Sequence, residues 1–208
     1  MEFNADVFKA IYPQQYQKEF HNNNMRTDGR EFHKSRNIHI KSNVINSAAG
    51  SSLVRIGDTT IICGLNLELC DHEAFIATSE LSCNINIHFT PICGAEYDYE
   101  KTTDKEANLN QLLLQFLNSC HILQDEQLTI EHGKYKWLIT ATLYCLNYDG
   151  NAEDCSLLAL IGSLQDLKIP NTKLIETDED EKIIINHDQQ QQYHKLSWTI
   201  IPIPITIA

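Results

Sequence analysis

The sequence predicts an α+β fold in which a mixed β-sheet packs against helices, and three observations carry this prediction. The apolar, β-branched run from Trp137 to Leu146 is typical of a strand buried on both faces. After a cluster of turn formers, the segment from Ala152 to about Leu167 is apolar nearly all round, which predicts a helix inside the core. Between Leu109 and Cys120, large apolar residues recur with helical spacing and predict a second helix.

The first half of the chain adds a short helix and several strands. Aromatic residues are frequent in residues 3–21, and Pro13 predicts the first turn of an amphipathic helix that begins there. The Gly57-Asp58 pair between two apolar runs predicts a hairpin. Alternation or β-branched composition predicts strands at 38–40, 47–56, 59–65 and 85–89.

In the second half, the turn before the core helix has the composition of a helix start. Asn151 is the expected N-cap, with Glu153 and Asp154 at the positive end of the helix. Further strands are expected at 128–130 and 183–185, and polar loops at 177–181 and 189–192. The final run, 196–208, is β-prone but contains two prolines, which predicts an edge strand or a truncated element.

The composition is that of an ordinary globular protein, with 42% hydrophobic and 21% charged residues among 208. No run approaches the roughly 18 uncharged apolar residues of a membrane span, and the first residues lack the basic start of a signal peptide, so no membrane partner is expected. The seven cysteines form no C-x-x-C pair and lie mostly in apolar runs, which predicts buried thiols in a reducing, intracellular compartment. Cys70-Asp71-His72 supplies too few ligands for zinc, so neither a metal nor a cofactor is expected.

The net charge of −12 limits what the chain can do with nucleic acid. A protein that binds RNA by itself usually carries a basic surface. We therefore expect any RNA contact to use a local patch or a surface shared with other chains. The candidate cations are Arg26, Arg30, Arg36 and Lys101.

Three spaced motifs give the chain a family resemblance. They are Arg26-Thr27-Asp28-Gly29-Arg30, the Gly50-Ser51-Ser52-Leu53-Val54 run that continues to Gly57 and Thr59-Thr60, and Tyr148-Asp149-Gly150-Asn151 with Asp154. Together they resemble the RNase PH family, and within it the catalytically silent ring subunits of the eukaryotic RNA exosome. The likeness runs over about residues 13–207, which suggests an extension (1–24) followed by one RNase PH-like domain (25–208).

The resemblance implies a fold, a function and a set of partners. The fold would be the ribosomal S5 domain 2-like type, built from two βαβ halves, with the family's last segment missing here. The function would be that of a non-catalytic ring subunit that supports 3′-to-5′ RNA processing and degradation. Its partners would be other RNase PH-like subunits in a hexameric ring, the cap subunits, and RNA passing through the channel. The expected locations are the nucleus, nucleolus and cytoplasm.

Departures from the family pattern predict that the phosphate site is degenerate. Phosphorolytic members carry a Gly-Gly-Thr-Arg-Thr loop, whereas this chain has Gly150-Asn151-Ala152-Glu153-Asp154, which places Glu153 where an arginine binds phosphate. The first-helix arginines of active members correspond to neutral Gln111, Gln115 and Asn118. The family's catalytic aspartates would fall after the last residue of this chain.

The same residues also have purely structural interpretations. Asp28 and Arg30 suit a turn-stabilising pair better than an RNA clamp, and Asp149 and Asp154 suit a turn and a helix start better than acid–base catalysis. The glycines of the second motif suit tight backbone positions, because their spacing fits no phosphate loop.

The sequence therefore leaves three hypotheses for the function. The leading hypothesis is a non-catalytic ring subunit. The alternative is a phosphorolytic 3′-exoribonuclease subunit that acts through a site shared with a partner. The third, a free-standing RNA-binding module, agrees poorly with the net charge of −12.

Overall fold

The computed structural model describes residues 5–71, 83–93, 97, 104–120, 122–130, 135–177, 180–185, 193–198 and 201–206. Residues up to Asn37 form one compact unit, and residues from Ile38 onward form a second. The predicted division into 1–24 and 25–208 stays a prediction. No helix in the described ranges is long and apolar enough to cross a membrane.

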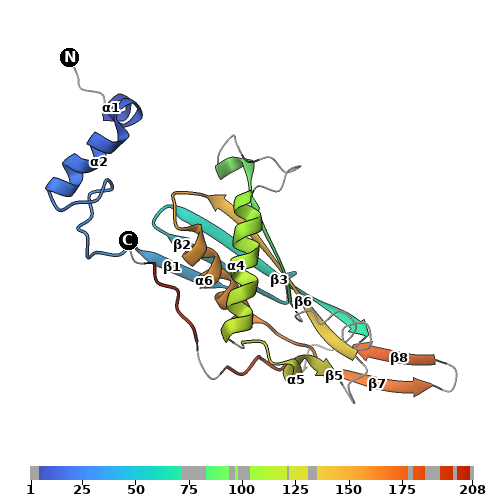
Figure 1. Ribbon diagram of the computed structural model, residues 1–208. Coiled ribbons are helices and arrows are strands. Elements are labelled where there is room, and N and C mark those ends of the chain that lie inside the picture. Colours follow the sequence, from blue (N-terminus) through green and yellow to red (C-terminus); the bar gives the residue numbers. More distant parts are fainter. Residues whose placement is uncertain are drawn as a thin grey trace. The chain divides into compact units, whose positions relative to one another are not determined.

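The N-terminal unit consists of two short helices and a loop (Figure 1). The helices are α1 (Ala5–Ile11) and α2 (Pro13–Asn22), and Pro13 at the start of α2 confirms the predicted helix start. Their aromatic side chains form a stripe in which neighbouring ring centroids lie 5.0 to 6.1 Å apart, and it comprises Phe8, Tyr12, Tyr16 and Phe20. None of the residues of α2 is buried.

The second unit is built on a mixed six-stranded sheet with the order β1-β2-β3-β6-β4, in which β5 also pairs with β6. The strands are β1 (Ile38–Ser42), β2 (Gly50–Ile56), β3 (Thr59–Asp71), β4 (Cys83–Phe89), β5 (Thr129–Ile130) and β6 (Tyr135–Asn147). Only β4 and β6 run parallel among these pairs. The predicted strands are confirmed, although β2 begins at Gly50 and β3 and β6 extend further than predicted.

Two helices cover one face of the sheet (Figure 1). They are α4 (Asp104–Cys120) and α6 (Ala152–Asp166), while the short α5 (Asp125–Leu128) and a 3₁₀ turn (Pro91–Cys93) complete the unit. As predicted, α6 is buried nearly all round, and Glu153 and Gln165 are its exposed residues. α4 buries Leu109, Leu113 and Leu117 against the sheet, whereas the predicted core residues Leu112 and Phe116 are half-buried.

The prediction that β6 is buried on both faces is wrong. Its residues alternate, so that Ile139, Ala141 and Leu143 are fully buried under the helices while Tyr144 on the opposite face is 41% exposed. The apolar composition of the strand misled the prediction, because its second face carries Thr140, Thr142 and other half-buried side chains. The sheet therefore has one helix-covered face and one open face.

Two glycines of the second motif occupy tight backbone positions, as predicted. A Cβ at Gly50 would lie 2.6 Å from the carbonyl oxygen of Ser163 and 2.8 Å from Cα of Leu167, so glycine allows β2 to approach the end of α6. Gly57 turns the β2–β3 hairpin with a left-handed φ of 62°.

The segment after α6 differs from the prediction. Strands β7 (Thr172–Thr177) and β8 (Asp180–Ile185) pair as an antiparallel hairpin, so Asp180 and Glu181 lie in a strand and not in a loop. The predicted loop at 189–192 lies outside the described residues. The predicted edge strand at the end is wrong, because 193–198 and 201–206 contain no strand and make only one isolated bridge, between Ile169 and His194. Pro202 and Pro204 lack the N–H groups that a strand ladder needs.

The cysteines are unpaired, and most are buried, as predicted. Burial raises the pKa of the Cys63, Cys83 and Cys155 thiols to about 12. These three side chains therefore remain neutral thiols at physiological pH. Cys120 is the exposed exception.

Candidate functional site: the turn between β6 and α6

The turn that joins β6 to α6 is held by the β2–β3 hairpin. The Thr59 hydroxyl donates to the carbonyl oxygen of Gly150 (2.7 Å) and accepts from the N–H of Asp149 (2.9 Å). The Asn147 amide donates to the carbonyl oxygen of Asp58 (2.9 Å). Two left-handed residues in succession, Gly150 (φ 77°) and Asn151 (φ 54°), then turn the chain into the helix. Parts of the second and third sequence motifs are thus in direct contact.

At the N-terminus of α6, a side chain of the helix start bonds one of the free backbone N–H groups. Asn151 is the N-cap, as predicted: its Oδ1 accepts from the N–H of Asp154 (3.3 Å) and its Nδ2 donates to Asp154 Oδ2 (2.9 Å). Ala152 is buried and Glu153 is exposed. Two carboxylates therefore occupy the positive end of the helix, where an anionic ligand would otherwise bind.

Lys105, which the sequence did not single out, lies beside this turn. Its Nζ is 3.4 Å from the ring centroid of Tyr148 and 4.9 Å from that of Phe89, and it donates to the hydroxyl of Tyr97 (3.3 Å). Desolvation alone would lower the pKa of Lys105, but interactions with the Tyr148 and Tyr97 hydroxyls outweigh it and raise the pKa. The surrounding residues are far apart in sequence, so no local motif marks this cluster.

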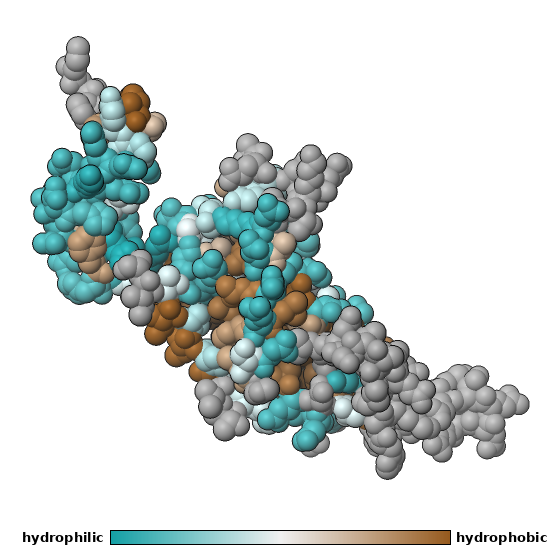
Figure 2. All heavy atoms as spheres, viewed as in Figure 1, coloured by the Kyte–Doolittle hydropathy of each residue, from teal (hydrophilic) through white to brown (hydrophobic). Residues whose placement is uncertain are grey.

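The three neutral residues of α4 are all exposed, as the prediction of a neutral face requires. Gln111, Gln115 and Asn118 point away from the sheet, and no described hydrogen bond joins them to the turn residues 151–154. Figure 2 shows a hydrophilic stripe over α4 with hydrophobic surface on both sides of it. The structure thus joins Asn151 and Asp154 of the predicted site by hydrogen bonds, and it places the glutamines on the exposed side of α4.

A model of the 3′ exoribonuclease family, domain 1 (RNase PH), matches residues 34–170. The chain belongs to the RNase PH family. The match includes the β2–β3 hairpin and the β6–α6 turn, and it ends at Pro170 after α6.

Related RNase PH-family proteins carry exosome names. The chain is 30% identical over 176 residues to "Exosome complex component rrp43" of Schizosaccharomyces pombe, a match that covers 82% of this chain and 63% of that protein. It is 30% identical over 171 residues to "Exosome complex component Rrp42" of Methanothermobacter thermautotrophicus, which covers 82% and 61%. The chain therefore spans less than two thirds of the length of these relatives.

Solved structures support the RNase PH-like fold. The chain superimposes on a subunit of the Archaeoglobus fulgidus exosome with RNA bound to the active site with a TM-score of 0.68 and 21% identity, over 86% of this chain and 76% of that one. A chain of an archaeal exosome core gives a TM-score of 0.61 at 21% identity, and the match covers 86% of this chain and 73% of that one. At this identity the comparison establishes the fold.

The first RNase PH-type motif forms a self-contained loop in the N-terminal unit. Arg30 Nε pairs with Asp28 Oδ2 (2.6 Å), which confirms the predicted turn-stabilising pair. Desolvation raises the pKa of Asp28, but the hydrogen bonds and the charge of Arg30 together outweigh it and, with Arg36, hold this pKa below its ordinary value. Arg26 donates to the carbonyl oxygen of Phe32 (3.2 Å), and its Nε is buried. Lys101, the fourth candidate RNA contact, lies outside the described residues.

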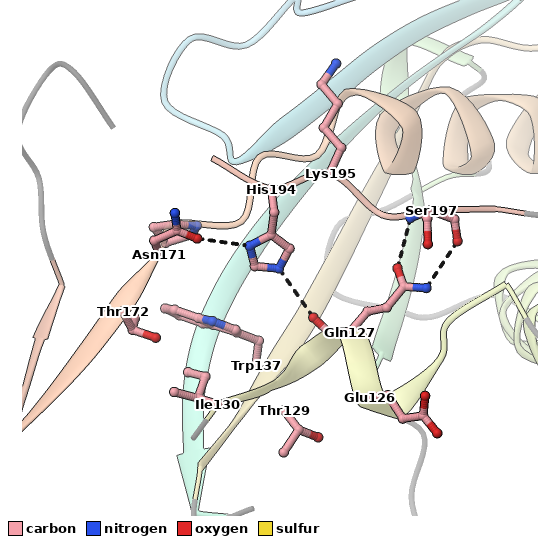
Figure 3. A pocket seen from close by; sticks show the side chains of 11 residues that line it. Glu126, Gln127, Thr129, Ile130, Trp137, Asn171, Thr172, His194, Lys195 and Ser197 are labelled. Carbon is pink, nitrogen blue, oxygen red and sulfur yellow. Dashed lines mark hydrogen bonds between the residues drawn. The ribbon is translucent and has the colours of Figure 1, made fainter. Parts of the chain in front are cut away.

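A separate hollow of about 420 Å³ lies at the other end of β6 (Figure 3). The imidazole of His194 stands over Trp137, with ring nitrogens 3.4 Å from Asn171 Oδ1 and from the carbonyl oxygen of Gln127. The Gln127 side chain bonds both backbone polar groups of Ser197 and so fastens residues 193–198 to α5. None of the sequence-predicted site residues lines this hollow. About ten strand residues, or roughly 33 Å, separate it from the β6–α6 turn.

Proposed function

We propose that this chain is a non-catalytic subunit of an exosome-type ring of RNase PH-family proteins, in which it helps to form the passage for RNA. Family membership and the exosome names of its relatives support this proposal. The observation that carries the non-catalytic part is the self-capped N-terminus of α6. Asn151 and Asp154 satisfy each other there, and Glu153 adds an exposed negative charge.

The physical reason is that phosphorolysis requires a bound inorganic phosphate as the attacking group. A helix N-terminus attracts phosphate through its free N–H groups and its dipole. In this chain the Asp154 N–H is already bonded, and the nearby carboxylates repel an anion. The resemblance places a phosphate-binding arginine where Glu153 stands, so the sign of the local charge is reversed.

The test is phosphate-dependent release of nucleoside diphosphates from a 3′-tailed RNA by the purified chain. We expect no release above background, and we expect Glu153→Arg alone to create none, because Asn151 and Asp154 still cap the helix. An active RNase PH-family enzyme serves as the positive control. Sustained release by the wild-type chain that depends on phosphate would overturn the proposal.

A phosphorolytic subunit acting through a site shared with a partner is the second candidate, and Lys105 is the observation that favours it. Its ammonium lies beside the turn, and no carboxylate is within ion-pair distance of it among the described residues. The assembled ring distinguishes the two candidates. Phosphorolysis by the ring that falls when Lys105→Met is introduced would favour a shared site, and unchanged phosphorolysis would favour the non-catalytic role.

A further inference from the structure

The two edges of the sheet differ in whether their outward backbone groups have hydrogen-bond partners. At the β4 edge, the N–H of Ile87 donates to Asn110 Oδ1 (2.9 Å) and the N–H of Phe89 donates to Glu106 Oε1 (2.7 Å). Both acceptors come from α4 and are one helical turn apart, so they follow the two-residue repeat of outward N–H groups along the strand. At Ile87 and Phe89 this edge is closed to another strand, because these two donors are already used.

The β1 edge has no such cover among the described residues, where only β2 pairs with β1. All five residues of β1 are exposed, Ile38 and Ile40 each by 52%. The N–H of Asn43 donates to the carbonyl oxygen of Ser51 (2.8 Å), in continuation of the Ser42↔Ser52 register. In an antiparallel pair inward and outward groups alternate, so Ile38, Ile40 and Ser42 direct their backbone groups away from β2.

The side chains of β1 give this edge a definite chemistry. Ile40 lies against α6, where its Cγ2 would be 3.7 Å from a Cβ at Gly162, and Ile38 lies on the same face. His39 and Lys41 project from the opposite face, and both are exposed. A strand added here would meet apolar side chains on the face of α6 and positive charge on the open face.

We propose that β1 is the docking edge for a β-strand of a neighbouring ring subunit, one that alternates apolar residues with Asp or Glu. The apolar residues would extend the row of Ile38 and Ile40, and the carboxylates would lie beside Lys41 and His39. The outward N–H and C=O groups of Ile38, Ile40 and Ser42 would form the ladder. This inference rests on the proposed function, since it names the surface that the ring uses.

The experiment compares Ile40→Pro with Ile40→Ala in the full chain, co-expressed with the RNase PH-family proteins that co-purify with it. Proline removes the outward N–H of residue 40, whereas alanine keeps it and removes a similar amount of side-chain packing. We expect Ile40→Pro to weaken ring assembly about tenfold more than Ile40→Ala. Thermal unfolding of each isolated variant reports whether the pairing of β1 with β2 survives.

Two further measurements test whether a strand of the partner pairs with β1. Hydrogen exchange at Ile40 and Ser42 should slow at least tenfold on assembly, while Lys41→Glu should weaken assembly through charge repulsion. If the ring forms with unprotected amides at these positions, or if Ile40→Pro behaves like Ile40→Ala, the inference is wrong and the proposed function stands. Self-association of the isolated chain through β1 would also overturn it, and the absence of any ring would overturn both.

Discussion

At Asn151 one side chain both accepts from the backbone of Asp154 and donates to its carboxylate, while its own backbone adopts a left-handed φ of 54°. Asparagine tolerates this conformation better than other residues with a Cβ, because its short polar side chain bonds locally. The start of α6 and the occupation of its N-terminus therefore depend on the same residue. The stability of the core helix and the hydrogen bonding at its N-terminus thus depend on one side chain.

Asn151→Ala is expected to lower the free energy of unfolding by about 2 kcal/mol, since it removes the cap and leaves alanine in a left-handed conformation. Urea unfolding of the full chain measures the change. Asn151→Gly is the matched variant: it also loses the cap but relieves the backbone strain, so it should cost clearly less. Equal losses for the two variants would mean that backbone conformation plays no part at this position.

At the scale of elements, Lys105 links the start of α4 to the end of β4 and to the β6–α6 turn. Its ammonium lies over Tyr148 and Phe89, and its bond to Tyr97 reaches a third segment. A cation over aromatic rings contributes about 1 kcal/mol, depending on how far it is desolvated. The cluster thus fastens three segments at the end of the sheet that carries the candidate site.

Lys105→Met should destabilise the chain by about 1 kcal/mol at pH 7, whereas Lys18→Met at an exposed position of α2 should change stability by less than about 0.5 kcal/mol. The pKa of Lys105 is raised above its ordinary value of 10.5, so the folded state binds the proton more tightly than the unfolded state. The gap between wild type and Lys105→Met should therefore be constant up to about pH 10 and shrink above it. A gap that widens at high pH would contradict the assigned role.

The elements that the sequence predicted correctly are those with local signals. The caps and all-round apolar pattern of α6, the periodicity of α4 and the Gly57-Asp58 turn each lie within one short segment. β7 was missed because the acidic residues around the start of β8 were interpreted as a loop. The closed β4 edge and the Lys105 cluster join residues distant in sequence, and no periodicity reports such contacts. At the candidate site, Asn151 was predictable as a cap, but its reciprocal bond with Asp154 was not.

At the scale of the whole molecule, charge decides how the isolated chain meets RNA. The net charge of −12 repels a polyanion. Of the predicted RNA contacts, Arg30 is already paired with Asp28, and Arg26 bonds the carbonyl oxygen of Phe32. These arginines stabilise their own loop, and Asp28 partly neutralises the charge of Arg30.

RNA binding by the isolated chain is therefore expected to be weaker than micromolar at physiological salt and to weaken further as salt is raised. Filter binding or fluorescence anisotropy with a single-stranded RNA, repeated over a range of salt concentrations, measures both properties. Arg36→Ala should change the affinity little in the isolated chain. Submicromolar binding at physiological salt would show that a basic surface exists that the described residues do not reveal.

The closed edge of β4 also bears on how the chain reaches its fold. β4 pairs with β6, more than fifty residues further along the chain, so forming that pairing costs more loop-closure entropy than a local contact does. α4 begins fifteen residues after β4 ends, so Glu106 and Asn110 reach the strand by closing a much shorter stretch of chain. α4 can thus cover the N–H groups of Ile87 and Phe89 before β6 pairs with the other edge of β4. The unpaired strand then exposes less of its backbone to other nascent chains. The side chains of α4 that accept from the N–H groups of β4 in the folded protein would then also reduce wrong strand pairing during folding.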